Sequence, residues 1–266
     1  MDNKFLFALL LTTIAGLSTG IGSAVAFFAR RTNTKLLSVA LGFSAGVMIY
    51  VSFIEILPQA FALAKSALTS ASDTYVVLAF FAGIAIIFLI DALIPANENP
   101  HEMHNVEEMQ TRNVPNESDL KRTGILMALA IAIHNFPEGI ATFASAVVAP
   151  EIAIPIAIAI AIHNIPEGIA VSVPIFYATG NRRKAFYMSF MSGMAEPLGG
   201  VLGFLFVMKY MSEFGLGMLM AAVAGIMVFI SVDELLPGSE KYGHHHYSIG
   251  GFVAGMAIMA ASLLLL

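Results

Sequence analysis

Two copies of one eight-residue motif carry the side chains that could do chemistry in this sequence. The first copy, at 134–141, reads His-Asn-Phe-Pro-Glu-Gly-Ile-Ala, and the second, at 163–170, reads His-Asn-Ile-Pro-Glu-Gly-Ile-Ala. Each copy lies in a long apolar run, where imidazole, amide and carboxylate groups are costly unless they meet a partner. We therefore interpret the two motifs as parts of a functional site.

The spacing within each motif favours metal binding. His134 and Glu138 are four residues apart, as are His163 and Glu167, so each pair shares one face of a helix. An asparagine follows each histidine. Nitrogen and oxygen ligands without sulfur suit Zn, Fe(II), Mn or Co, and imidazole favours these metals over Mg or Ca. The sequence has no cysteine, which excludes thiolate ligands and disulfides.

The composition indicates that these motifs lie in a membrane. The chain of 266 residues is 58% hydrophobic and only 12% charged, whereas soluble domains carry about 25% charged residues. We predict one all-α integral membrane domain over 1–266, embedded in the lipid bilayer of the cell (inner or plasma) membrane. There is no broad basic surface for nucleic acid.

Eight segments are long and apolar enough to form the helices that would position the motifs, since a spanning helix needs about 20 apolar residues. They cover 4–29, 36–63, 74–95, 123–147, 151–177, 185–208, 214–236 and 247–266. Ten of the 13 lysine and arginine residues fall on one side of this layout. The positive-inside rule makes that side cytoplasmic and puts both termini outside, with 96–122 as the one long inner loop.

A second internal similarity predicts symmetry. Residues 54–58 (Ile-Glu-Ile-Leu-Pro) resemble 233–237 (Asp-Glu-Leu-Leu-Pro), in predicted helices that cross in opposite directions. The two motif-bearing helices are also antiparallel. Both relations fit a 3+2+3 inverted arrangement about a pseudo-two-fold axis, which is typical of transporters with a midplane site. Chance similarity of common apolar residues is the alternative.

The layout brings both motifs to mid-membrane, and Glu196 lies at the centre of the 185–208 segment. Because the motif helices are antiparallel, Glu138 should lie at the depth of His163, and Glu167 at the depth of His134. A rise of 1.5 Å per residue separates these two layers by about 6 Å. We therefore predict two adjacent cation positions with shared carboxylates. Pro137, Pro166 and Pro197 should kink the three helices, because proline cannot donate to the carbonyl four residues earlier.

Several polar residues outside the motifs have two interpretations each. Glu55 lies toward the outer end of its helix, as a metal entrance or as an interfacial residue. Three acidic residues near inner helix ends serve metal release or interfacial capping: Asp91, Asp233 and Glu234. The run His244, His245 and His246 is a metal relay or an ordinary loop. The 96–122 segment is a polar linker or a weak metal-catching tract.

These residues resemble the ZIP (Zrt/Irt-like protein) family of divalent metal transporters. The resemblance rests on His-Asn-x-Pro-Glu-Gly at 134–139, on its repeat at 163–168 and on Ala-Glu-Pro-Leu-Gly at 195–199. The eight-helix layout, the outside termini and the long inner loop agree with it. The compact length and the doubled motif are most similar to the bacterial ZupT-like branch.

The resemblance implies uptake of zinc into the cytoplasm, with iron, manganese, cobalt and cadmium as further substrates and no organic cofactor. It implies a binuclear midplane site made of His134, Asn135, Glu138, His163, Asn164, Glu167 and Glu196. Some members of the family have other polar residues at 163 and 164, and many have histidine in place of Glu55, so metal preference does not transfer simply. The family further implies homodimers and an elevator-like movement of the first, fourth, fifth and sixth helices.

Two other functions compete with transport. Histidine and glutamate on bundled helices also build membrane di-iron enzymes, but those use Glu-x-x-His spacing, whereas this chain has His-x-x-x-Glu with a proline between. A metal sensor would need a soluble output domain, and the sequence offers none.

Overall fold

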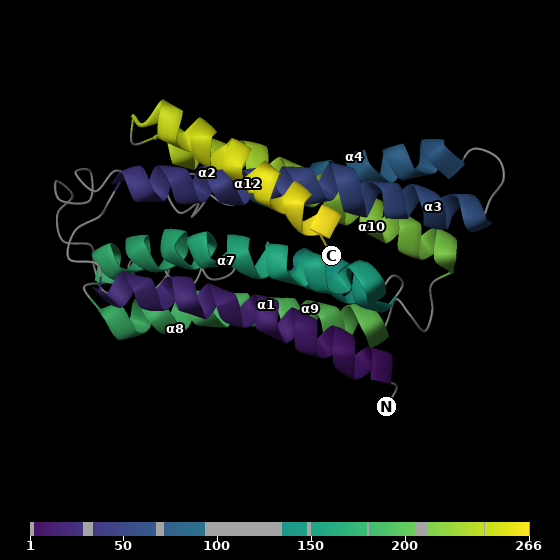
Figure 1. The fold of residues 1–266 in the computed structure, drawn as a ribbon, viewed down its shortest axis with the longest axis horizontal. Coiled ribbons are helices and arrows are strands. Elements are labelled where there is room, and N and C mark those ends of the chain that lie inside the picture. The colour runs from purple at the N-terminus through teal and green to yellow at the C-terminus, as the bar shows by residue number, and fades with distance from the viewer. Residues whose placement is uncertain are drawn as a thin grey trace.

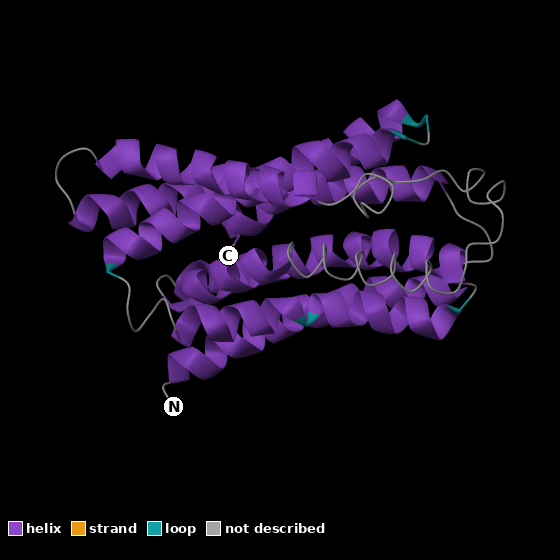
Figure 2. Cartoon of the chain, turned by 180° about the vertical axis from the view of Figure 1, so that it is seen from behind, coloured by secondary structure: helices purple, strands orange, loops and turns teal. Residues whose placement is uncertain are grey.

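The computed structural model describes residues 3–28, 34–67, 72–93, 135–147, 150–179, 181–205, 212–241 and 243–265. Every regular element in these ranges is a helix, as Figure 2 shows, which confirms the all-α class for this part of the chain. The labelled helices are α1 (Asn3–Phe28), α2 (Thr34–Val51), η1 (Ser52–Ile56), α3 (Leu57–Ala67), α4 (Ser72–Leu93), α7 (Pro150–Thr179), α8 (Arg182–Gly193), α9 (Ala195–Gly203), α10 (Glu213–Ile230), η4 (Ser231–Leu235), α11 (Leu236–Glu240) and α12 (His245–Leu265). One further helix covers 135–147. His134 and the predicted loop 96–122 lie outside the described residues.

Five stretches of the described helices are long and apolar enough to cross a membrane. They cover 3–24, 34–66, 72–92, 213–240 and 245–264, and a shorter apolar stretch covers 153–169 within α7. Large apolar side chains remain exposed on α4, among them Leu78, Phe81 and Leu89. Such an apolar surface suits contact with lipid rather than water. The chain is therefore a multi-pass membrane protein.

The helices form two groups, which Figure 1 shows as two layers. The first, called the site group, contains α1, the 135–147 helix, α7, α8 and α9. The second, called the frame group, contains α2, η1, α3, α4, α10, η4, α11 and α12. Within the site group α1 packs along α7 and α8, and within the frame group α12 packs along α2 and α10 along α4.

Glycines allow the backbones within each group to touch. In the site group, a methyl group at Gly139 would lie 1.9 Å from the carbonyl oxygen of Glu196, so the 135–147 helix meets α9 backbone to backbone. In the frame group, a methyl group at Gly46 would lie 2.1 Å from the carbonyl oxygen of Phe252. Small residues permit this close approach between membrane helices. The tight backbone contacts therefore hold each group together as a unit.

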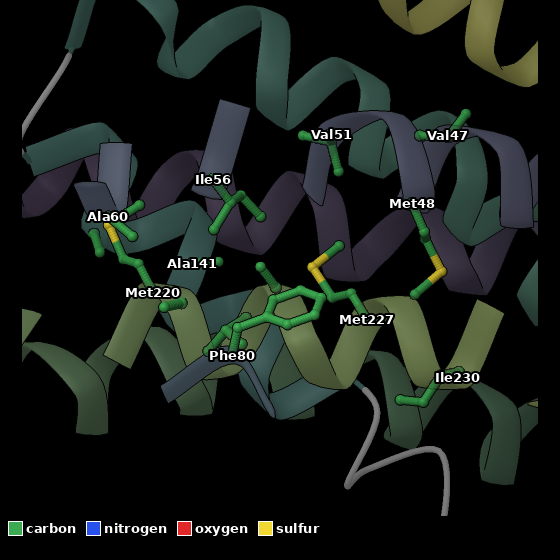
Figure 3. Packing of buried hydrophobic residues seen from close by; sticks show 14 of the residues in the cluster. Val47, Met48, Val51, Ile56, Ala60, Phe80, Ala141, Met220, Met227 and Ile230 are labelled. Atoms are coloured by element: carbon green, nitrogen blue, oxygen red, sulfur yellow. The ribbon is translucent and has the colours of Figure 1, made fainter. Parts of the chain in front are cut away.

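The two groups meet through α7, which packs against α2 and α12. The 135–147 helix adds Ala141 and Ala144, which belong to the apolar cluster of the frame group. Figure 3 shows Ala141 among the side chains of that cluster, with Ile56 and Met220. The interface between the groups is thus largely a contact of side chains.

Two helical turns of the frame group are wider than α-helical. In η1 the N–H of Leu57 donates to the carbonyl of Ser52, five residues back, and in η4 the N–H of Leu236 donates to Ser231 in the same way. A proline follows each turn, at 58 and 237, and proline has no N–H to continue the α-helical pattern. These π turns coincide with the sequence similarity between 54–58 and 233–237, and such turns are frequent at functional sites.

Candidate metal centre

Prolines shape the helices that carry the motifs, with different results. Pro166 does not interrupt α7, which runs as one helix from Pro150 to Thr179 through the second motif. The predicted weakening is instead visible near Glu196, where α8 ends at Gly193, Met194 forms a turn and α9 starts at Ala195. Pro197 cannot donate to the carbonyl four residues earlier, that of Gly193. The break therefore falls beside the third carboxylate of the predicted site.

Three side chains of the two motifs converge in the interior. Glu138, His163 and Glu167 each offer a donor atom, and these atoms all lie within 4.8 Å of one another. His163 Nε2 is 3.3 Å and 3.4 Å from the two carboxylate oxygens of Glu138. All three residues are buried, with exposures of 1%, 0% and 4%. Buried carboxylates are expensive unless paired or bound to a metal, so this cluster suits a cation.

A second set of polar groups involves Glu196. The amide nitrogen of Asn164 donates to the carboxylate of Glu196 and, at 3.0 Å, to the main-chain carbonyl of Ala15. Both acceptors fix the orientation of the amide, so its oxygen is the atom left over. That oxygen is buried and has no hydrogen-bond partner among the described residues. An amide oxygen of this kind is available as a hard ligand next to the carboxylate.

The other asparagine has the same arrangement. The amide nitrogen of Asn135 donates to the main-chain carbonyl of Ser192 on α8, at 3.2 Å. Its side-chain oxygen is also buried and without a hydrogen-bond partner in the described part of the chain. Both asparagines therefore use their nitrogen for helix packing and keep an oxygen for another contact. His134, the remaining residue of the predicted site, lies outside the described residues.

The residues predicted near the two ends of a transport path lie in the frame group. Glu55 is on η1, and its carboxylate accepts a hydrogen bond from the amide of Gln59. Asp233 and Glu234 are on η4, the matching π turn. Asp91 is near the end of α4 and is half-buried. The structure brings none of these four acidic residues into the Glu138 cluster.

The three consecutive histidines surround the start of α12. His244 Nε2 is 3.1 Å from the hydroxyl of Thr34 at the start of α2. His245 Nδ1 is 2.8 Å from a carboxylate oxygen of Glu240, and the ring of His246 lies beside that of His245. Among the described residues, no third acidic or histidine ligand joins the His245–Glu240 pair closely enough to complete a metal site.

Sequence reasoning missed polar contacts that approach this centre from the frame group. The hydroxyl of Ser44 on α2 donates to the main-chain carbonyl of His163, at 2.8 Å. The hydroxyl of Ser145 donates to the side-chain oxygen of Gln59, at 3.5 Å. Serine is common in membrane helices, where it bonds to neighbouring helices. No residue pattern distinguishes these serines from the others.

Comparison with known proteins identifies the family. A family model described as ZIP zinc transporter matches residues 91–263. The "Zinc transporter ZupT" of Clostridium perfringens is 57% identical over 280 aligned residues, which cover 99% of this chain and 97% of that protein. The proteins of the same name from Streptococcus mutans and Nitratidesulfovibrio vulgaris are 56% and 54% identical, and each alignment covers at least 98% of both chains.

These relatives agree with this chain in length as well as in sequence. Transport is therefore the activity of the family, and the alternative of a membrane di-metal enzyme finds no support among the relatives. The matched region includes both histidine motifs and Glu196. The chain belongs to the ZIP zinc transporter family.

Proposed function

We propose that this chain carries Zn²⁺ into the cytoplasm through a site at the centre of the membrane. The observation that carries the proposal is the buried group of Glu138, His163 and Glu167, whose donor atoms lie within 4.8 Å of one another. Zinc is bound by imidazole nitrogen and carboxylate oxygen, and three such ligands leave a coordination position open. The relatives named as zinc transporters support the choice of metal.

The site holds two cations. Glu138, His163 and Glu167 bind the first, and Glu196 with the amide oxygens of Asn164 and Asn135 binds the second, together with His134. The hydrogen bond between Asn164 and Glu196 supports this division, because it keeps both groups beside the first cluster. Three carboxylates offset most of the charge of two divalent cations. Mixed nitrogen and oxygen ligands also accept Fe²⁺, Mn²⁺, Co²⁺ and Cd²⁺.

The chain crosses the membrane eight times, with both termini outside and a 3+2+3 inverted arrangement. The paired π turns support the repeat. The segments 52–58 and 231–237 share serine at the first position, glutamate at the fourth and Leu-Pro at the end, and both form a π turn just before the proline. The cytoplasmic side is the one that carries most of the lysine and arginine.

Transport occurs by movement of the site group against the frame group. The backbone contacts at glycine within each group support two rigid units, and the side-chain contact between them supports sliding. Glu55 receives the metal on the outer side. Asp91, Asp233, Glu234 and the three histidines at 244–246 pass it on to the cytoplasm. Two chains form a homodimer.

Uptake of radioactive zinc into proteoliposomes tests the proposal. The purified wild type is compared with Glu138→Gln, Glu167→Gln and Glu196→Gln. Glu213→Gln is the matched control, because Glu213 is an exposed carboxylate that accepts a hydrogen bond from Ser66. We expect uptake by the wild type and the control, and loss of uptake in the three site variants. Unchanged uptake in all three variants would exclude this site, and no uptake by the wild type would exclude zinc transport.

A further inference from the structure

One hydrogen bond connects the frame group directly to the backbone of the metal centre. Ser44 lies on α2 and is completely buried. Its hydroxyl donates to the main-chain carbonyl of His163 on α7, at 2.8 Å. The side chain of the same histidine lies against Glu138. The bond therefore joins a fixed point of the frame group to the residue at the centre of the candidate site.

This bond differs from other polar contacts between the two groups. Ser145 donates to Gln59 and Ser262 donates to the carbonyl of Pro155, but both of these distances are 3.5 Å. Hydrogen bonds weaken as they lengthen beyond about 3.2 Å. The Ser44 bond has ordinary length and is buried, so it is the better defined of the three.

The surroundings of the bond make it specific for one placement of α7. Apolar residues of the site group, including Ala141, Ala144 and Ile169, contact the frame group around it. Apolar contacts of this kind are non-directional and tolerate sliding. A hydrogen bond requires a given distance and angle and is strengthened by apolar surroundings. Displacement of α7 along α2 by one helical turn would therefore break the bond while replacing apolar contacts with similar ones.

We propose that Ser44 is a positioning residue that holds α7, and with it His163, in the placement seen here. The hydroxyl stabilises this arrangement of the two groups relative to the displaced one, and the bond breaks and re-forms in each transport cycle. The inference rests on the proposed function, because it requires the site group to move. It adds a residue outside the two motifs that sets the balance between conformations without binding the metal.

Two other serines on the same continuous helix provide matched controls. Ser38 on α2 and Ser52 on η1 are also completely buried. Their hydroxyls have no hydrogen-bond partner among the described residues. Replacement of any of the three by alanine removes one oxygen atom and favours helix formation slightly. The three variants therefore differ in the loss of the bond to His163 and not in the kind of change.

Cross-linking measures the placement of the two groups. Because the chain has no cysteine, Gln59→Cys with Ser145→Cys introduces one thiol on each group, at side chains that are in contact. A short bifunctional thiol reagent then reports how often the arrangement seen here is populated in detergent. The loss of one hydrogen bond shifts an equilibrium about fivefold. We expect the rate of cross-linking to fall by about that factor in Ser44→Ala when this arrangement is the minor state, and by less when it is the major state. We expect no change in Ser38→Ala and Ser52→Ala.

Uptake of radioactive zinc, measured on the same single variants in the cysteine-free background, separates the two proposals. A hydroxyl that touches no ligand side chain should leave the KM for zinc within about twofold. Equal cross-linking in Ser44→Ala and in both serine controls, with zinc uptake by the wild type, would overturn the positioning role and leave the proposed function intact. An increase of more than about tenfold in KM would mean that Ser44 binds the metal and would overturn it too. Absence of uptake by the wild type would overturn the proposed function, and this inference with it.

Discussion

The imidazole of His163 lies 3.3 Å from the carboxylate of Glu138, although the two residues come from different copies of the motif. Each copy thus meets the other through its unlike residue, histidine against glutamate. This is the pairing expected for antiparallel helices whose motifs lie at the same depth. Both side chains are buried, so the pair must be held by its own contacts or by a cation.

Removal of the charge of Glu138 should abolish transport with little loss of shape. In Glu138→Gln the amide keeps the volume of the side chain but is a much weaker ligand for zinc, and it loses the charge that faces His163. We expect the uptake of radioactive zinc to fall by about a hundredfold. The matched change Glu213→Gln, at an exposed carboxylate, should leave uptake within about twofold. Uptake above about half of the wild-type rate in Glu138→Gln would contradict a ligand role.

The contact between Glu138 and His163 could be anticipated because few quantities determine it. The depth of a residue in a membrane follows from its position in an apolar segment, and the direction of the segment follows from the flanking charges. Both quantities can be read from the sequence. The same reasoning anticipated that Glu196 lies at the same depth.

Other contacts could not be predicted in this way, because they depend on the rotation of each helix about its axis. The bond from Asn164 to Glu196 requires that α7 and α9 face each other, and the bond from Ser44 to His163 requires that α2 faces α7. Nearly uniform apolar helices give no periodic signal for rotation. Glycines carry some of that information, since Gly139 marks the face that meets Glu196, but the sequence does not say which backbone each glycine meets.

The continuity of α7 was also hard to predict. A proline within a helix removes one hydrogen bond, and we expected a kink at Pro166. The structure has one helix there and places the interruption at Met194, between α8 and α9. Neighbouring helices can satisfy the freed carbonyl of a membrane helix, so the position of the break depends on tertiary contacts.

Asn164 should contribute to stability as well as to the site. Asn164→Ala removes both the donor to Glu196 and the donor to the carbonyl of Ala15. Leaving buried acceptors without a donor costs about 1–3 kcal/mol, so we expect a lower melting temperature in detergent without zinc. Ser172→Ala on the same helix is the control, because its buried hydroxyl bonds within the helix, to Gly168. Equal melting temperatures of the two variants would contradict the bridging role of Asn164.

Gly139 should be intolerant of even one additional methyl group. In Gly139→Ala the new carbon would lie 1.9 Å from the carbonyl oxygen of Glu196, so the 135–147 helix must move away from α9. Overpacking of this kind costs about 1–3 kcal/mol or more. Gly250→Ala on α12 is the matched control, since nothing lies within 4 Å of its new carbon. We expect a lower melting temperature and impaired zinc uptake in the first variant and wild-type behaviour in the second. Normal uptake in Gly139→Ala would mean that this close packing is not required.

The two proposed cation positions can be counted. Glu138, His163 and Glu167 form one compact group, whereas Glu196 is bonded to Asn164, so a change at Glu196 should empty one position and spare the other. Equilibrium dialysis of purified protein against zinc should give about two bound ions per chain for the wild type and about one for Glu196→Gln, because a site that has lost its carboxylate binds zinc much more weakly. Zinc held by the exposed pair of His245 and Glu240 would add equally to both counts, and the His245→Ala background removes that contribution. The same count in wild type and Glu196→Gln would contradict separate positions, and a count of about one in the wild type would replace the binuclear site with a single shared one.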